Sequence, residues 1–303
     1  MARPLGWWRW CRRLIGQDGN TVDEATLGTP ASSREGALDR AIARGELRLA
    51  YQPKLHLRSQ RITSLEALVR WQHPERGLIL PGEFIPAAEK SDEILALSLW
   101  VIAQAIADQQ LLAMRGHDLP IFVNIAADLL ANGGFIDRAC AMIQAGGTRI
   151  GLEITETSVI RDPGAAIANL HRVAALGIQV AIDDYGAGLS SLAYLKQLPA
   201  CELKIDKLFI TQLTSSNRDP LIVRSTIDLA HAMEMEVVAE GVESQAALAL
   251  LSVMGCDMAQ GYYISRPVAL DVVTTFLDRH RDGWVADECG SATPRWTVAL
   301  KRA

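Results

Sequence analysis

The sequence lacks the features of several common protein classes. It has five cysteines among 303 residues, and no two of them form a CxxC pair, so neither a disulfide framework nor a cysteine-based zinc site is expected. No apolar stretch reaches about 18 to 20 uncharged residues, so no transmembrane helix is expected. The formal net charge of -5 argues against bulk attraction to nucleic acid, and no DNA binding is expected. These observations favour a cytoplasmic protein with reduced thiols.

The N-terminus also lacks the apolar core and the cleavage site of a signal peptide. Residues 7–15 are instead basic and rich in tryptophan, and residues 17–33 are polar with weak periodicity. We interpret residues 1–33 as a flexible basic and aromatic segment followed by a linker. The alternative is that this segment contacts a partner protein or lies on an anionic surface, which would make the protein peripheral to the inner membrane.

From residue 34 to about residue 284, short runs rich in β-branched residues alternate with helical patterns, and an irregular tail follows over 285–303. The pattern predicts eight strands, at residues 47–56, 62–71, 121–125, 150–155, 179–183, 201–205, 236–239 and 258–264. Only three residues, Arg58, Ser59 and Gln60, separate the first two strands, which must therefore be antiparallel. We expect an α/β fold, a (β/α)8 TIM barrel with an irregular start. An open doubly wound sheet is the competing fold, but the first βα connection lacks the glycine-rich turn that such a sheet needs.

Charged side chains interrupt several of these apolar strands. Glu66 and Arg70 share one face of the second strand, where a buried acid and a buried base need partners or a metal. Similar polar residues stand near the ends of the other strands. Together they are Gln52, Glu66, Arg70, Asn124, Glu153, Glu156, Asp183, Asp184, Lys204, Asp206, Glu240, Glu243 and Gln260.

One acid at a strand end is most often a helix cap or part of a loop ion pair. Acids and amides at the ends of five strands are a stronger signal, because the C-terminal strand ends of a barrel converge. A set made only of oxygen ligands suits Mg²⁺ or Mn²⁺ better than zinc or copper. Asp183 could bridge two such ions while Asp184 binds the second, and such ions can activate water for attack on a phosphoester. Lys204 would be a local cation there, or else the partner of Asp206 in a structural ion pair.

Taken together, these residues resemble the EAL family of cyclic di-GMP phosphodiesterases. The resemblance covers residues 35–281 and is carried by several motifs in one order. They are Tyr51-Gln52-Pro53, Glu66-Ala67-Leu68-Val69-Arg70-Trp71, Asn124, Glu153-Ile154-Thr155-Glu156, Asp183-Asp184-Tyr185-Gly186, Leu203-Lys204-Ile205-Asp206, Ala239-Glu240-Gly241-Val242-Glu243, Gln260-Gly261-Tyr262 and Ser265-Arg266-Pro267.

The resemblance implies a modified barrel with an antiparallel first strand, two divalent cations, a homodimer, and hydrolysis of cyclic di-GMP to linear pGpG. It implies metal ligation by Glu66, Asn124, Glu153, Asp183, Asp184 and Glu240, with Asp183 bridging. It assigns catalysis to Lys204, Glu240 and Glu66. It assigns substrate contacts to Gln52, Arg70, Gln260 and Pro267, and support of the active-site loops to Glu156, Gly186, Gly188 and Glu243.

The loop after the fifth strand departs from the pattern of the family. Ala187 stands where a threonine is common, and Leu189 replaces an aromatic residue, whereas the glycines remain. The alternative to an active phosphodiesterase is a catalytically weak or inactive cyclic di-GMP receptor or scaffold. Such members usually lose metal ligands or the lysine, and this sequence keeps them all, so we favour the enzyme. An unrelated metal-dependent barrel is a more remote third alternative.

Overall fold

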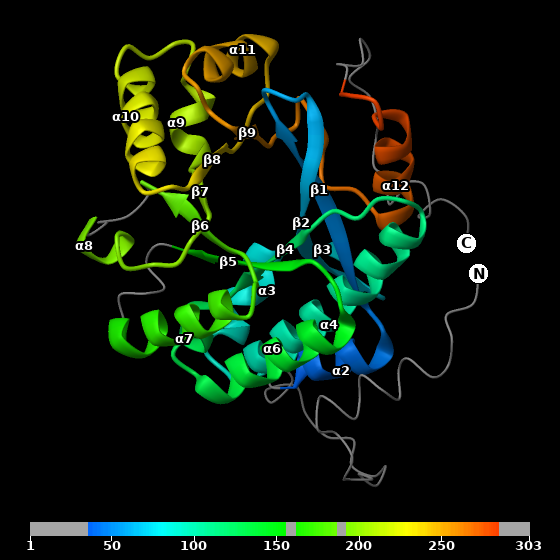
Figure 1. Ribbon diagram of the computed structural model, residues 1–303. Helices are drawn as coiled ribbons and strands as arrows, with labels where there is room; N and C mark the ends of the chain where they lie inside the picture. The colour runs from blue at the N-terminus through cyan, green and yellow to red at the C-terminus, as the bar shows by residue number, and fades with distance from the viewer. Residues whose placement is uncertain (1–35, 156–161, 187–191, 285–303) are drawn as a thin grey trace, which may run out of the picture.

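The computed structural model describes residues 36–155, 162–186 and 192–284, which form a barrel of strands surrounded by helices (Figure 1). The strands are β1 (Leu47–His56), β2 (Arg61–His73), β3 (Gly77–Ile79), β4 (Ile121–Ile125), β5 (Ile150–Thr155), β6 (Val180–Tyr185), β7 (Glu202–Ile205), β8 (Glu236–Ala239) and β9 (Met258–Ala259). The helices are α2 (Ala37–Arg44), α3 (Pro81–Ala88), α4 (Glu93–Met114), α5 (Ala127–Leu130), α6 (Gly133–Gly146), α7 (Pro163–Ala175), α8 (Leu192–Leu195), α9 (Lys207–Thr211), α10 (Asp219–Ala232), α11 (Gln245–Val253) and α12 (Leu270–Arg279).

The barrel closes because β1 pairs with both β2 and β9, which completes the order β1-β9-β8-β7-β6-β5-β4-β2. The pairs from β2–β4 to β8–β9 are parallel, whereas β1 is antiparallel to both of its neighbours. The modified barrel expected from the sequence is thus confirmed. The antiparallel register places Gln52 of β1 directly opposite Glu66 of β2, so both side chains lie near the same end of the barrel.

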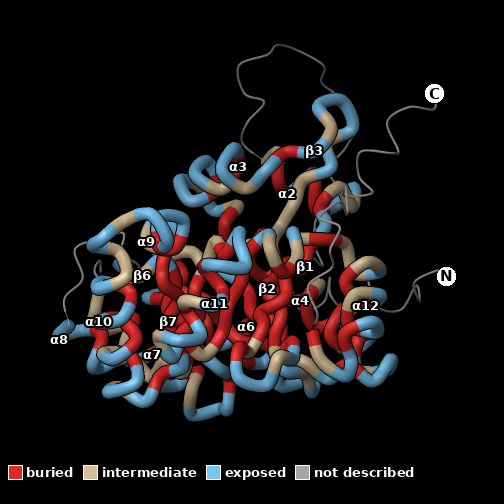
Figure 2. Tube along the Cα trace, turned by 90° about the horizontal axis from the view of Figure 1, so that it is seen from above, coloured by how far each residue is buried: buried red, intermediate tan, exposed pale blue. Residues whose placement is uncertain are grey.

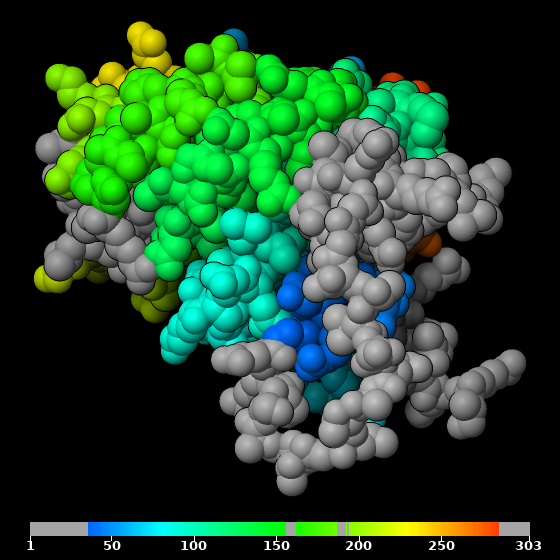
Figure 3. Space-filling model, turned by 90° about the horizontal axis from the view of Figure 1, so that it is seen from below, coloured from blue at the N-terminus to red at the C-terminus, as the bar shows by residue number. Residues whose placement is uncertain are grey.

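A small lobe of α2, α3 and β3 lies at one side of the barrel. The strand β3 extends β2 beyond the barrel, with Ile79 paired to Trp71. Figure 2 shows these elements grouped together, and Figure 3 shows the blue and cyan residues of α2 and α3 projecting beyond the green barrel helices. Trp71 packs edge-on against Phe84 of α3, at 5.8 Å between ring centroids, and so ties the lobe to the end of β2.

The helix α4 is long and apolar enough to cross a membrane by length and composition. Its most apolar stretch is nevertheless 67% buried inside the protein. It contacts α2, α6 and the strands β1, β4 and β5, so its apolar residues serve the core, as a helix that is apolar all round is expected to do.

The last strand is shorter than the sequence predicts. The pattern predicts a strand over 258–264, but β9 ends at Ala259 and the chain then turns. The turn is held by hydrogen bonds from the backbone nitrogens of Ile264 and Ser265 to the carbonyl of Gly261. The turn keeps Gln260 inside the barrel and carries the chain away from it.

Substitution of Gly261 by alanine should destabilise the protein by roughly 2 kcal/mol or more, since a Cβ there would collide with the backbone nitrogen and oxygen of Val242. The backbone must then move at a place where Val242 donates its N–H to the carbonyl of Gln260. Thermal unfolding measures the effect as a drop of several degrees in Tm. Gly82→Ala is the matched control, because a Cβ at that helical position meets no atom within 4 Å. Equal Tm values for the two variants would contradict the predicted collision.

Candidate active site

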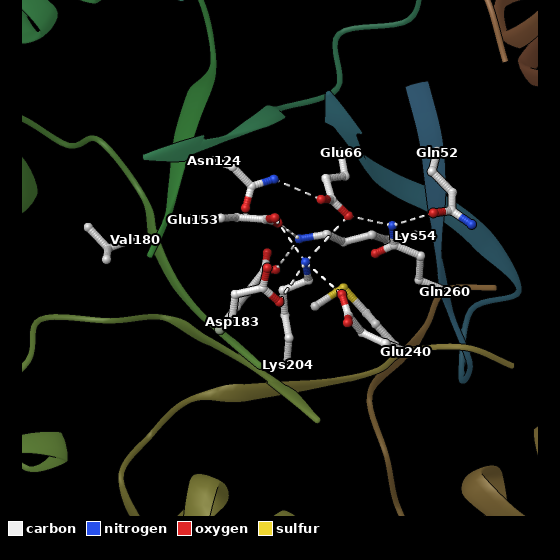
Figure 4. Close-up of polar contacts among 12 residues, drawn as sticks. Gln52, Lys54, Glu66, Asn124, Glu153, Val180, Asp183, Lys204, Glu240 and Gln260 are labelled. Atoms are coloured by element: carbon white, nitrogen blue, oxygen red, sulfur yellow. Dashed lines mark hydrogen bonds and ion pairs between the residues drawn. The ribbon is translucent and has the colours of Figure 1, made fainter. Parts of the chain in front are cut away.

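Polar side chains from six strands, and from the residues that directly follow β8 and β9, converge inside one end of the barrel (Figure 4). They project inward because side chains alternate along a strand, and the inward positions at the C-terminal ends of parallel strands meet there. The group contains Gln52, Lys54, Glu66, Asn124, Glu153, Asp183, Lys204, Glu240 and Gln260.

Lys204 lies at the centre of the group and is fully buried. Its Nζ is within 2.7 to 3.3 Å of four carboxylates, those of Glu66, Glu153, Asp183 and Glu240. These attractions outweigh the cost of burial and raise the pKa of Lys204 well above its ordinary value. Lys204 is therefore a buried, charged ammonium. Asp206, the alternative ion-pair partner of Lys204, has a different role: it caps α9 by accepting a hydrogen bond from the backbone N–H of Leu208 at 2.7 Å.

The carboxylates form two groups that share Asp183. Glu66, Glu153 and Asp183 each offer an oxygen within 4.8 Å of the others, and so do Asp183, Asp184 and Glu240. Adjacent strand residues normally point to opposite faces, but Asp184 has a left-handed φ of 55° and the β6–β7 register is irregular between Ile182 and Tyr185. Aspartate tolerates this conformation better than most residues. The local bend turns both neighbouring carboxylates toward the same site.

The carboxyl groups differ strongly in their acidity. Burial alone would raise the pKa of Glu153, but the ammonium groups of Lys204 and Lys54 lower it to about 2. Burial, together with the carboxylates of Asp183 and Glu66, raises the pKa of Glu240 to about 8 despite Lys204. Too many negative charges are crowded in this space for two lysines to stabilise them all.

Glu66 is fixed through both of its oxygens. Its Oε1 accepts a hydrogen bond from Nδ2 of Asn124 at 2.9 Å, and its Oε2 accepts one from Nε2 of Gln260 at 2.7 Å. The Gln260 amide also donates to Oε1 of Gln52 at 3.0 Å, and Gln52 donates to the carbonyl of Ser265. Gln52 and Gln260 are both buried; Gln260 holds the carboxylate of Glu66 directly, and Gln52 accepts a hydrogen bond from Gln260.

The donor set suits hard divalent cations. It consists of carboxylate oxygens and one amide, grouped so that one carboxylate serves both candidate sites. Oxygen ligands of this kind prefer Mg²⁺ or Mn²⁺, and cations would offset the excess of negative charge. Among the described residues, those that could hold one ion are Glu66, Asn124, Glu153 and Asp183, and those that could hold a second are Asp183, Asp184 and Glu240.

The other residues that the sequence assigned to the site are not members of this group. Arg70 is half-buried further along β2, where burial lowers its pKa although Glu66 and Tyr262 oppose the shift. Pro267 is half-buried beside the residue that pairs with β1, and Glu243 is exposed on the connection after β8. Gly186 stands two residues after Asp184, has a φ of 98° and lies against the ring of Phe209. The predicted loop residues Glu156 and Gly188 lie outside the described residues, as do Ala187 and Leu189.

Two buried residues escaped the sequence analysis. Lys54 of β1 and Glu202 of β7 form an ion pair inside the barrel at 2.6 Å, and Lys54 also contacts Oε1 of Glu153 at 2.9 Å. A signal was present in both strands: Lys54 is two residues after Gln52 and Glu202 is two residues before Lys204, so each shares the inward face of a residue already assigned to the site.

Comparison with known proteins agrees with this geometry. The EAL domain family matches residues 35–267. The chain is 37% identical over 260 residues to the bifunctional diguanylate cyclase/cyclic di-GMP phosphodiesterase MucR of Pseudomonas aeruginosa. The matched region covers 84% of this chain and 38% of that relative. It is 40% identical over 266 residues to an uncharacterised protein of Mycobacterium tuberculosis, over 86% of this chain and 43% of the relative. The chain thus spans less than half the length of these curated relatives.

Solved structures show the same barrel. A MucR phosphodiesterase domain in complex with cyclic di-GMP superposes with a TM-score of 0.75 at 37% identity, over 79% of this chain and 99% of that one. The EAL domain of DcpA from Mycobacterium smegmatis superposes with a TM-score of 0.65 at 31% identity, over 80% of this chain and 98% of that one. The family match spans most of the chain, and the chain belongs to the EAL domain family.

Proposed function

We propose that this protein is a metal-dependent phosphodiesterase that hydrolyses cyclic di-GMP to linear pGpG. The observation that carries the proposal is the pair of carboxylate groups that share Asp183, with the ammonium of Lys204 among them. The similarity to named cyclic di-GMP phosphodiesterases supports the choice of substrate. Every residue of the predicted metal set has a side-chain oxygen that can bind a cation.

The side chains have distinct proposed roles in this reaction. Two divalent cations, Mg²⁺ or Mn²⁺, would supply Lewis acidity and an activated water when bound. Lys204 keeps a positive charge beside the site, where it can stabilise the phosphate or the oxygen that leaves. Glu240, 2.7 Å from Lys204, is the candidate to accept the proton of the attacking water. Gln52, Arg70, Gln260 and Pro267 remain the predicted substrate contacts.

Product analysis with the purified protein tests the proposal. Incubation with cyclic di-GMP and Mn²⁺ or Mg²⁺ should yield pGpG, and a chelator should stop its formation. The competing function is a receptor or scaffold that binds the nucleotide without cleaving it. Tight binding of cyclic di-GMP with no pGpG at any Mn²⁺ concentration would select the receptor and reject the enzyme.

Calcium should inhibit the reaction. Ca²⁺ takes a larger and more flexible shell of oxygens than Mg²⁺, and it fits a compact pair of sites joined by one carboxylate poorly. Titration of Ca²⁺ into a Mg²⁺-dependent assay should therefore lower the rate of pGpG formation, and Ca²⁺ alone should support little turnover. Addition of excess Mg²⁺ should restore the rate, and full activity with Ca²⁺ alone would contradict the compact geometry.

The homodimer, the cytoplasmic location and the contact of the N-terminal segment with a membrane or a partner stay predictions. The N-terminal segment lies outside the described residues. Size measurement of the purified protein by light scattering, with and without cyclic di-GMP, tests the dimer directly.

A further inference from the structure

A buried ion pair lies deeper in the barrel, directly beneath the candidate metal ligands. Lys54 is fully buried, and its Nζ lies 2.6 Å from Oε2 of Glu202 and 2.9 Å from Oε1 of Glu153. Because β1 runs antiparallel to the strands with which it pairs, Lys54 follows Gln52 toward the interior of the barrel instead of toward its opening. From there its side chain links β1 to β5 and β7.

The interior is shaped to hold this ammonium. Nζ of Lys54 lies over the face of the Phe122 ring, 3.9 Å from the ring centroid. The ring fits there because residue 151 is glycine, and a Cβ at that position would lie 2.5 Å from the ring of Phe122. Lys54 thus has an aromatic face and two carboxylates around it, and these contacts restrict where its charge can lie.

The two oxygens of Glu153 are divided between two lysines. Oε1 contacts Lys54, and Oε2 contacts Lys204 at 2.9 Å. Lys204 also contacts three other carboxylates, so it cannot by itself fix the orientation of Glu153. Glu202 is a second carboxylate partner of Lys54, so one ammonium holds Glu153 and Glu202 together.

We propose that Lys54 is a positioning residue for the metal ligand Glu153: it holds Oε1 on the inner side of the barrel and directs Oε2 toward the cation site. This role rests on the metal-dependent function proposed above, because it concerns the orientation of a ligand. Groups that hold a metal ligand in place typically contribute a factor of about 10 to 100 in metal affinity or activity.

Mn²⁺ binding to the intact chain, measured by isothermal titration calorimetry, tests the role. Lys54→Met should weaken Mn²⁺ binding about tenfold or more. Charge alone predicts the reverse, because removal of a nearby positive charge favours a cation. Glu202→Gln is the matched control: it neutralises the other member of the ion pair but keeps the contact between Lys54 and Glu153, and it should bind Mn²⁺ nearly as well as the wild type.

The double variant Lys54→Met/Glu202→Gln covers the case in which Lys54→Met alone fails to fold, because it leaves no unpaired charge at Glu202. If Lys54 positions Glu153, the double variant should bind Mn²⁺ as weakly as Lys54→Met. Wild-type affinity in the double variant, or affinity that is unchanged or stronger in Lys54→Met, would overturn the positioning role. A wild-type protein that binds Mn²⁺ but forms no pGpG would reject the proposed function alone, because the affinities still decide the role of Lys54.

Discussion

Replacement of Asp183 by asparagine should lower kcat/KM for cyclic di-GMP by a factor on the order of 10³ or more. Asp183 is the one carboxylate common to both candidate metal groups, so its loss affects both sites at once. Asparagine keeps the size of the side chain and an oxygen ligand, but it removes the charge and the capacity to bridge two cations. The rate of pGpG formation at saturating Mn²⁺ measures the effect.

Asp184→Asn is the matched control for this experiment. The two aspartates are neighbours, but Asp184 belongs to one metal group only and is largely exposed. Its replacement should lower kcat/KM less than that of Asp183. Similar Tm values for both variants and the wild type would show that the difference does not come from unfolding. Equal activity losses in the two variants would contradict the bridging role of Asp183.

The barrel could be predicted because its signals are local. Apolar runs of strand length alternate with helical patterns, and the short connection after His56 allows only an antiparallel start. The sequence pattern predicts the helix of the lobe over residues 37–43, which is α2. The other two elements were missed because β3 has three residues and α3 contains Pro86, so neither has enough periodicity to stand out. The early end of β9 was missed because it depends on the close approach of Gly261 to Val242, a contact between distant parts of the chain.

The site was predictable where its residues end parallel strands. Acids such as Glu153 and Asp183 interrupt apolar strands, and the barrel brings all such strand ends together. Lys54 was not found by this reasoning because β1 runs in the opposite direction, so its inward residues follow a different order along the barrel axis. The hydrogen bond between Gln52 and Gln260 likewise could not be predicted, because it joins residues 208 apart in the sequence.

The bend at Asp184 is a further feature that sequence periodicity hides. Strict alternation along β6 would send Asp183 and Asp184 to opposite faces, and only the left-handed φ of Asp184 lets both reach the site. The following glycine, Gly186, also has a positive φ, at 98°. Two positive φ values within three residues show that the chain leaves the strand abruptly at the point where the second candidate metal group forms.

Lys204→Met should lower turnover by about 100-fold or more, because the ammonium beside the reacting phosphate is lost. It should also destabilise the metal-free protein by about 3 to 5 kcal/mol, the usual cost when one member of a buried ion pair is removed. Four carboxylates within 3.3 Å of the lost ammonium would then repel one another without a central positive charge. Lys207→Met, at an exposed position on the following helix, is the matched control and should change neither quantity.

Thermal unfolding with and without Mn²⁺ separates this prediction from a general loss of packing. Lys204 and a divalent cation compensate the same carboxylates, so Mn²⁺ should raise the Tm of Lys204→Met by more than it raises the Tm of the wild type. A variant that had lost only apolar contacts would gain the same increment from Mn²⁺ as the wild type. Equal increments would therefore mean that Lys204 does not compensate the carboxylates that hold the cations, and its central place in the proposed reaction would have to be abandoned.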